Sequence, residues 1–286
     1  MIEDILGVDL GGSKMHFIIY HQGQLIEERY PTGVDCSSEP IRDHLHDFLD
    51  RLGFKPRAIG MAIPGGVNAE GTFITLTDSL PMACYTPASY FTRDGIPIRM
   101  LGDMHSAILA AADPYPDDVN VTIVMMGSGV AYGSRSWDRE SGKVVYGGMD
   151  LGYIVFDTPE GPKHLNSIAG GRSILRAAGM EGPELAQKVR EKDPKALEVV
   201  DRVGYFVGMA MSTVRLTTHP KVIALGGGAS TYEGMFEKIR DTFDKTCLPL
   251  YREGVEIIRP NVPTSLVGEG AIIFARDTFF PEERGA

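Results

Sequence analysis

The chain has 286 residues, of which 43% are hydrophobic and 23% charged, and its formal net charge at pH 7 is −10. This composition is typical of a globular protein long enough to form two lobes with separate hydrophobic cores. The negative charge argues against a general nucleic-acid-binding surface, which needs a basic stripe to replace counterions. We therefore expect no nucleic-acid partner. A polyanionic ligand must be held by backbone N–H groups, a few cations and a metal ion.

The three cysteines, Cys36, Cys84 and Cys247, lie far apart and form no C-x-x-C pair. This pattern excludes the usual zinc spacing and a disulfide framework, and it favours a reducing compartment. The N-terminus lacks the basic stretch of a signal peptide, and no apolar run approaches the roughly 18 residues that span a bilayer. The sequence predicts a cytoplasmic protein without membrane association.

In the first half, apolar runs bounded by turn residues predict strands, and apolar residues three and four apart predict helices. The predicted elements are strands at 5–9, 15–20, 58–63 and 96–101, a further strand after the turn at 21–24, and helices at 39–52 and 105–112. The proline- and aspartate-rich segment 113–118 (DPYPDD) predicts a hinge.

The second half of the chain begins again with the same order of predicted strands and helices. The predicted elements are strands at 119–126, 130–136, 143–146, 221–225 and 255–258, and helices at 167–178, 183–191, 194–218, 232–246 and 268–279. Alternating strands and helices predict the α/β class, and the restart indicates a repeat of architecture, although not of sequence. We expect a smaller N-terminal lobe over 1–113, completed by the C-terminal helix within 268–286, and a larger lobe over 114–267.

A glycine turn joins the first two strands of each half. Asp9 ends a strand before Gly11-Gly12-Ser13-Lys14, and the second turn is Gly127-Ser128-Gly129. Glycine lets backbone approach a phosphate, serine and lysine add donors, and a strand-end aspartate such as Asp9 can hold Mg²⁺ through water. Neither turn has the P-loop pattern or the full dinucleotide fingerprint. Each alone also fits a tight hairpin, but their equivalent positions favour phosphate binding.

A third glycine turn and a second aspartate also follow predicted strands. Gly226-Gly227-Gly228 follows a buried strand, where a purine can pack on backbone that lacks side chains. Asp103 lies between a strand and a helix of small residues, where aspartate is a common helix cap. A general base for phosphoryl transfer also needs a carboxylate near the ligand, and capping would orient it. Both roles of Asp103 stay open on the residues alone.

Six segments in order resemble the ROK family, whose name covers repressors, open reading frames and sugar kinases. They are residues 6–14 (LGVDLGGSK), 60–71 (GMAIPGGVNAEG), 101–112 (LGDMHSAILAAA), 126–133 (MGSGVAYG), 165–171 (LNSIAGG) and 222–228 (VIALGGG). The resemblance implies an α/β, actin-like ATPase (ribonuclease H-like) fold of two lobes with a central cleft. It also implies an ATP- and Mg²⁺-dependent kinase that phosphorylates a hydroxyl of a sugar-like molecule, and it is compatible with a homodimer.

The resemblance also assigns roles to individual residues. Asp103 matches the catalytic base, and the acceptor side of the site includes Gly65 and Asn68, although a loop asparagine is also a common turn residue. The nucleotide residues that match the family motifs are Asp9, Gly11, Gly12, Ser13, Lys14, Gly127, Ser128, Gly129, Gly226, Gly227 and Gly228.

Four acceptor-side positions depart from the family pattern. Gly102 stands where sugar kinases usually have asparagine. Asp150 and Tyr153 replace the Glu and His of the G-E-x-G-H segment, and Asn166 replaces a further sugar-binding Glu. The cysteine-rich zinc motif is missing, so we expect no structural zinc. A site built on particular hydroxyl contacts discriminates strongly when those contacts change. We expect an acceptor other than plain glucose, such as a modified sugar, an amino-sugar or a cyclitol, with lost activity as the alternative.

Two other functions are compatible with the fold. A repressor needs a winged helix-turn-helix before the sugar-binding body, and only five residues precede Leu6, so we expect none. A non-catalytic sugar-binding sensor stays open, although a sensor has no need of Asp103 together with two phosphate turns. Consumption of ATP in the presence of sugars distinguishes the two.

Overall fold

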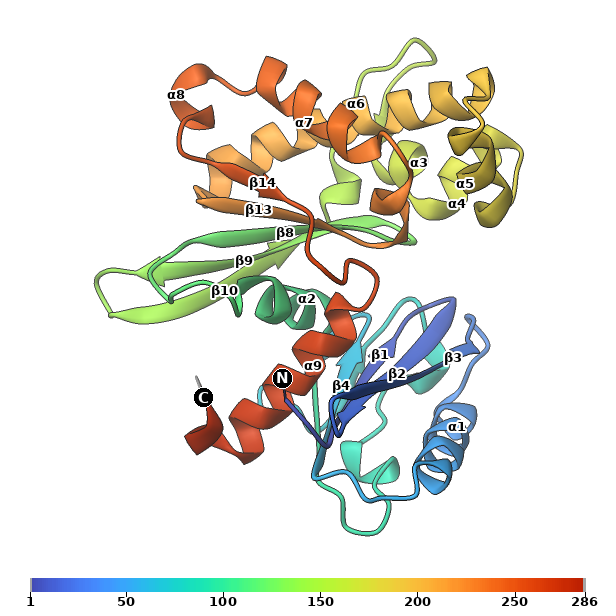
Figure 1. The fold of residues 1–286 in the computed structure, drawn as a ribbon, viewed down its shortest axis with the longest axis vertical. Helices are drawn as coiled ribbons and strands as arrows, with labels where there is room; N and C mark the ends of the chain where they lie inside the picture. The colour runs from blue at the N-terminus through green and yellow to red at the C-terminus, as the bar shows by residue number, and fades with distance from the viewer. Residues whose placement is uncertain (1, 285–286) are drawn as a thin grey trace. The chain divides into compact units, whose positions relative to one another are not determined.

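The computed structural model describes residues 2–284, and the chain divides into two compact units. Unit 1 contains residues 1–110 and 265–286, and unit 2 contains residues 111–264. Each unit is built on its own five-stranded sheet with helices packed against it (Figure 1). Among the residues that the structure describes, no helix is both long and apolar enough to cross a membrane.

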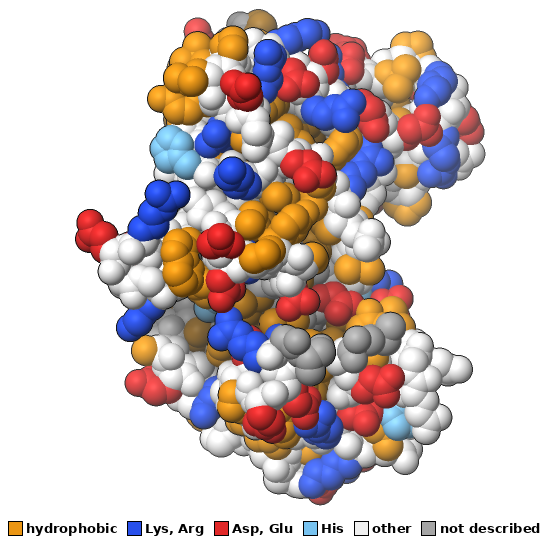
Figure 2. Space-filling model, turned by 60° about the vertical axis from the view of Figure 1, so that its left-hand side comes forward, with side chains coloured by type: hydrophobic (Ala, Val, Ile, Leu, Met, Phe, Trp, Pro, Cys, Tyr) orange, Lys and Arg blue, Asp and Glu red, His pale blue; other side chains and the backbone are white. Residues whose placement is uncertain are grey.

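Basic and acidic side chains alternate over the surface drawn in Figure 2. Among the described residues on this face, the basic side chains form no continuous stripe. This mixed pattern agrees with the excess of acidic over basic residues, 38 against 28.

Unit 1 is built from the N-terminal part of the chain and the last long helix. Its elements are β1 (Ile5–Leu10), β2 (Lys14–His21), β3 (Gln24–Pro31), α1 (Ser38–Arg51), β4 (Ala58–Ile63), β5 (Gly66–Val67), β6 (Ile74–Leu76), β7 (Ile98–Gly102), α2 (Asp103–Ala112), α9 (Leu266–Phe279) and short 3-10 turns at Pro81–Ala83, Ala88–Tyr90 and Pro281–Glu283. The sheet order is β3-β2-β1-β4-β7. The β3-β2-β1 pairs are antiparallel, and β1, β4 and β7 are parallel.

Helices α1 and α9 cover opposite faces of this sheet. Because side chains alternate along a strand, successive residues of β1 face different helices. Leu6 and Val8 pack in one cluster with Phe48 of α1, whereas Ile5 packs in another with Ile272 of α9. By the same alternation Asp9 shares the α9-facing side of β1.

Glycines let α9 approach its neighbours closely. A Cβ on Gly60 of β4 would lie 1.9 Å from the carbonyl oxygen of Ala271, and one on Gly270 would lie 1.7 Å from that of Ser106 in α2. The Ser106 hydroxyl donates to the Val267 carbonyl at 2.5 Å. The start of α9 therefore lies directly against β4 and α2.

Replacing Gly270 with alanine will destabilise the protein by about 1–3 kcal/mol, because the added methyl overlaps a carbonyl oxygen and α9 must shift. This loss exceeds the gain in helix propensity from glycine to alanine. Gly33→Ala is the control, since a Cβ there meets nothing within 4 Å. Urea unfolding midpoints measure the difference, and equal midpoints for the two variants would contradict the close packing of α9.

Unit 2 repeats the strand arrangement of unit 1. Its elements are β8 (Val121–Met126), β9 (Val130–Asp138), β10 (Lys143–Met149), β11 (Val155–Phe156), β12 (Lys163–His164), α3 (Asn166–Ala169), α4 (Gly171–Ala178), α5 (Gly182–Arg190), α6 (Pro194–Thr218), β13 (Val222–Gly226), α7 (Met235–Thr246), α8 (Pro249–Arg252), β14 (Glu256–Ile258) and short 3-10 turns at Leu151–Tyr153 and Gly228–Thr231. The sheet order is β10-β9-β8-β13-β14. Two antiparallel pairs are again followed by parallel strands, so the predicted repeat of architecture is present in the two sheets.

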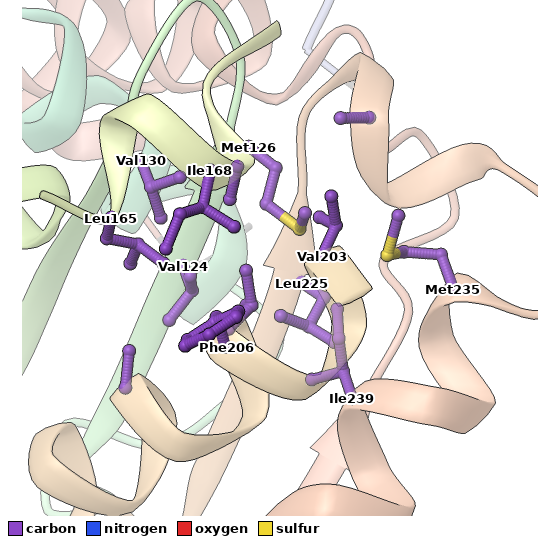
Figure 3. Close-up of a cluster of buried hydrophobic side chains, with 14 of the residues drawn as sticks. Val124, Met126, Val130, Leu165, Ile168, Val203, Phe206, Leu225, Met235 and Ile239 are labelled. Carbon is purple, nitrogen blue, oxygen red and sulfur yellow. The ribbon is translucent and has the colours of Figure 1, made fainter. Parts of the chain in front are cut away.

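The core of unit 2 lies between its sheet and the long helices α6 and α7. Val203 and Phe206 of α6 join Leu225 of β13 and Ile239 of α7 in one buried cluster (Figure 3). This cluster continues to the ends of β8 and β9, where the second predicted phosphate turn begins.

Two predicted helices differ from the structure. The helix predicted over 167–178 is broken into α3 and α4, because Gly170 is extended at ψ 142°. The next residue, Gly171, donates its N–H to the Gly127 carbonyl at 2.9 Å, which fixes where α4 begins. Helix α9 begins at Leu266, two residues before the predicted start, and ends at Phe279 as predicted. The last two residues of the segment 268–286 lie outside the described part of the chain.

The predicted hinge segment 113–118 surrounds a buried arginine of unit 2. Arg135 on β9 is only 4% exposed. Its guanidinium donates to the carbonyl oxygens of Ala112, Tyr115 and Val119 at 3.1 Å each and to that of Pro116 at 2.6 Å. One side chain therefore organises the segment.

Candidate active site

The carboxyl ends of the parallel strands of unit 1 gather three predicted site residues. Asp9 is the penultimate residue of β1, Gly65 comes two residues after β4, and Asp103 comes directly after β7. Because these strands are parallel neighbours, the three residues lie along one edge of the sheet. This is the edge at which open α/β sheets bind ligands.

Asp9 and Asp103 are electrostatically coupled. Burial, and then the negative charge of Asp103, raise the pKa of Asp9 to about 7, while the nearby Lys14 ammonium lowers it. The Lys14 side chain is exposed and makes no hydrogen bond or ion pair with another described residue. Two carboxylates that repel each other at a partly desolvated edge suit a divalent cation, because Mg²⁺ is bound through one or two carboxylates plus water and phosphate.

Replacing Asp9 with asparagine will stabilise the protein at pH 8 when nucleotide and divalent cations are absent. The raised pKa means that Asp9 costs no stability below about pH 4. Stability is lost progressively as the pH rises from about 4 to 7, and the full cost remains above pH 7. The expected gain is about 2–4 kcal/mol at pH 8 and near zero at pH 4. Thermal unfolding against pH measures it, with the exposed Asp47→Asn as control. Parallel curves for wild type and Asp9→Asn would contradict the coupling.

The first glycine turn is held by hydrogen bonds across the β1–β2 hairpin. The Gly11 N–H donates to the Lys14 carbonyl at 2.9 Å. Thr32 donates its hydroxyl to the Gly11 carbonyl at 2.5 Å and its N–H to the Ser13 carbonyl at 3.0 Å. The carbonyl oxygens of Gly11, Ser13 and Lys14 are therefore engaged by the hairpin and by Thr32, which follows β3, whereas the Ser13 and Lys14 side chains are exposed.

A residue that the sequence reasoning missed packs on this turn. A Cβ on Gly12 would lie 2.8 Å from the Cβ of Ser79 and 3.2 Å from its Oγ. Ser79 lies in a loop that is closed by the Leu80 N–H, which donates to the Thr77 hydroxyl at 3.2 Å. The contact joins residues 67 positions apart, and no local pattern in the sequence points to it.

Asp103 begins α2, and its Oδ1 accepts the N–H of Met104 at 2.7 Å. The carboxylate is thus oriented by the backbone N–H of the next residue, a contact different from the N2 or N3 bond of a helix cap. A Cβ on the preceding Gly102 would lie 3.2 Å from the Gly65 carbonyl oxygen. Gly65 itself has φ +148°, and a Cβ on it would lie 2.2 Å from the Leu76 carbonyl oxygen. Glycine at position 102 therefore leaves the space beside Gly65 and Asp103 without a side chain.

The side chain of Asn68 is engaged within its own turn. Its Oδ1 accepts the N–H groups of Thr72 at 2.8 Å and Phe73 at 2.9 Å. Its Nδ2 donates to Glu70 Oε2 at 2.8 Å and to the Thr72 hydroxyl at 3.0 Å. The structure gives Asn68 the turn role that the sequence also allowed.

The second glycine turn lies between β8 and β9 and contacts the start of α4. The Gly127 N–H donates to the Gly129 carbonyl, and the Gly127 carbonyl accepts from Gly171, both at 2.9 Å. A Cβ on Gly170 would lie 2.8 Å from the Ser128 carbonyl oxygen. A glycine turn and a helix N-terminus both present N–H groups to anions, and here the two are adjacent.

The third glycine turn lies beside the second, because β8 and β13 are parallel neighbours. Gly226 ends β13, and Gly228 starts a short 3-10 turn. Gly227 has φ +86°, and a Cβ on it would lie 2.4 Å from the Met126 carbonyl oxygen, so only glycine fits. Its N–H donates to the Pro263 carbonyl at 2.9 Å. Unit 2 thus has two glycine turns at the carboxyl edge of its sheet.

The predicted acceptor residues of unit 2 fall into two groups. Asp150 is exposed, and the Tyr153 side chain is 64% exposed, with its ring centroid 5.8 Å from that of His164. Asn166, by contrast, already has a partner in the chain, because its Oδ1 accepts the Val130 N–H at 2.8 Å.

Within residues 2–284, no group of three or more histidine, cysteine, aspartate or glutamate side chains is arranged to hold a metal ion. All three cysteines are free thiols.

The ROK family model matches residues 5–276. The chain is 23% identical over 254 residues to a kanosamine kinase of Amycolatopsis mediterranei, covering 78% of this chain and 80% of the relative. It is 24% identical over 305 residues to a glucokinase of Halalkalibacterium halodurans, covering 88% of each. Its structure resembles that of a ROK family glucokinase from Streptomyces griseus in complex with glucose and AMPPNP, with TM-score 0.80, 19% identity and coverage of 96% of this chain and 99% of that one.

Because the family model covers nearly the whole chain, the protein belongs to the ROK family. The predictions of this family and of an α/β, actin-like fold are both confirmed.

Proposed function

We propose that the protein is an ATP-dependent phosphotransferase that phosphorylates a hydroxyl of a sugar or sugar-like molecule. The observation that carries the proposal is the coupling of Asp9 and Asp103 beside the free ammonium of Lys14, on a ROK family fold. A phosphoryl donor brings negative charge and a metal ion, and this edge offers a cation, backbone donors and a carboxylate pair. The kinases among its relatives favour this activity over the non-catalytic sensor.

Asp103 is proposed as the general base. Its carboxylate accepts the proton of the attacking hydroxyl, while the glycine turns at 11–13 and 127–129 hold the phosphates in line. Gly226-Gly227-Gly228 offers flat backbone to the adenosine. Mg²⁺, held by Asp9 through water, would neutralise charge on the phosphates.

The acceptor is proposed to be an amino-sugar, a modified sugar or a cyclitol. Gly102 contributes no side chain, Asp150 has a carboxylate shorter than glutamate, and Tyr153 offers an exposed phenol. These residues offer contacts different from those of the asparagine, glutamate and histidine in the family pattern. They therefore favour an acceptor with a different pattern of hydroxyl and other substituents. Because all three cysteines are free thiols, we place the activity in a reducing, cytoplasmic compartment.

A panel of hexoses, amino-sugars, N-acetylated amino-sugars and cyclitols tests this proposal by ADP release from MgATP. At least one acceptor is expected to raise ADP release about a hundredfold or more above the rate without acceptor. Binding of a panel member by calorimetry, without ADP release from any, would instead support the sensor.

A further inference from the structure

Asn166 occupies the position at which the family pattern has a sugar-binding glutamate, yet its amide oxygen is engaged inside unit 2. The Oδ1 atom accepts the N–H of Val130, the residue directly after the Gly127-Ser128-Gly129 turn, at 2.8 Å. A Cβ on Gly129 would lie 3.0 Å from the same oxygen. The Asn166 side chain therefore lies against the last residue of the turn and fixes the first N–H after it.

The same amide also contacts the segment that carries Asp150 and Tyr153. A Cβ on Gly152 would lie 1.9 Å from Asn166 Oδ1, 2.1 Å from its Cγ and 2.4 Å from its Nδ2. The amide thus fills the space in which any other residue at position 152 would place its side chain. One side chain is packed between the phosphate turn and the acceptor-side 3-10 turn at Leu151–Tyr153.

The helix that carries Asn166 is anchored on both sides of it. Leu165 and Ile168 are buried in the core of unit 2 together with Val130 (Figure 3). The Asn166 carbonyl accepts the Gly170 N–H at 3.1 Å, just before α4 docks on the turn. The side chain is therefore held by fixed backbone rather than by a mobile loop.

We propose that Asn166 is a positioning residue for the nucleotide and not a reader of the acceptor. It sets the conformation of the Gly127-Ser128-Gly129 turn through Val130 and spaces that turn from the acceptor-side segment through Gly152. The inference rests on the proposed kinase function, since it assigns phosphate binding to this turn. It follows that discrimination among acceptors in unit 2 rests on Asp150 and Tyr153.

Two variants displace the same amide by different routes. Asn166→Ala removes it, whereas Gly152→Ala keeps Asn166 but inserts a methyl where the amide lies, at a position without a positive φ. Each variant is expected to raise the KM for ATP and the calorimetric Kd for MgATP about tenfold, because one hydrogen bond that orders the turn is lost. The KM for the acceptor is expected to stay within about twofold of wild type. The double variant is expected to lose less than the product of the two single effects, because both remove one contact.

Ser167→Ala is the matched control, because Ser167 is the next residue of α3 and is exposed. It is expected to leave both KM values unchanged. An Asn166→Ala enzyme whose KM rises for the acceptor and not for ATP would overturn the inference, as would a Gly152→Ala enzyme with wild-type nucleotide affinity. If wild type binds no MgATP in the calorimeter, the proposed function itself fails. If wild type binds MgATP and the variants bind it equally well, only the role of Asn166 fails.

Discussion

Asp103→Asn will lower kcat by about 10²–10⁴-fold, the range that a general base contributes, while the Kd for MgATP stays within a fewfold of wild type. Asparagine keeps the shape of aspartate and its oxygen can still accept the Met104 N–H, so α2 should form normally. What is lost is a carboxylate able to take the proton of the acceptor hydroxyl.

A second change should accompany the loss of kcat. Because the charge of Asp103 helps raise the pKa of Asp9, its neutralisation will lower the pKa of Asp9 toward the ordinary aspartate range. Stability of the nucleotide-free variant at pH 8 should therefore rise relative to wild type. Initial rates and thermal unfolding measure the two effects, with Asp47→Asn as the control. A kcat for Asp103→Asn within tenfold of wild type would show that Asp103 is not the general base.

Arg135→Met will destabilise the protein by about 3 kcal/mol, because the carbonyl oxygens of residues 112, 115, 116 and 119 all lose the buried guanidinium as a donor, although those of residues 112 and 116 keep a backbone donor. Methionine replaces the stem but no hydrogen bond, and the segment 113–118 is left without its organising group. Arg135→Lys is expected to be intermediate, since one ammonium cannot match the planar fork of a guanidinium.

The urea unfolding midpoint measures the stability of these variants. Arg139→Met, a change of an exposed arginine on the same hairpin, is the matched control and should have no effect. Equal midpoints for the Arg135 and Arg139 variants would show that the buried guanidinium does not stabilise the segment.

Local signals were sufficient for the long, regular elements. Helix α6 was predicted with its observed bounds, because Asp193 caps it by accepting the Ala196 N–H at 3.0 Å and a proline follows as the first helical residue. The helix ends where His219 takes a left-handed conformation, just before another proline. The strand β4 was also predicted at its observed bounds, since six consecutive residues are buried between α1 and α9.

The sequence could not show contacts between distant segments. The helix over 167–178 was predicted as continuous because its apolar period is unbroken, but Gly170 and Gly171 are shaped by the second glycine turn about 40 residues earlier. Ser79 against Gly12 and Asn166 against Val130 are of the same kind. Periodicity shows which face of an element is buried and leaves open which segment buries it.

The most direct test of the central claim is transfer of the γ-phosphate itself, followed by 31P NMR with MgATP and each acceptor that raises ADP release. We predict a new phosphate-ester resonance that grows in equal amount to ADP in wild type and is absent over the same time with Asp103→Asn. Formation of ADP and inorganic phosphate alone, with no ester from any acceptor, would contradict the assignment of this protein as a sugar-type kinase.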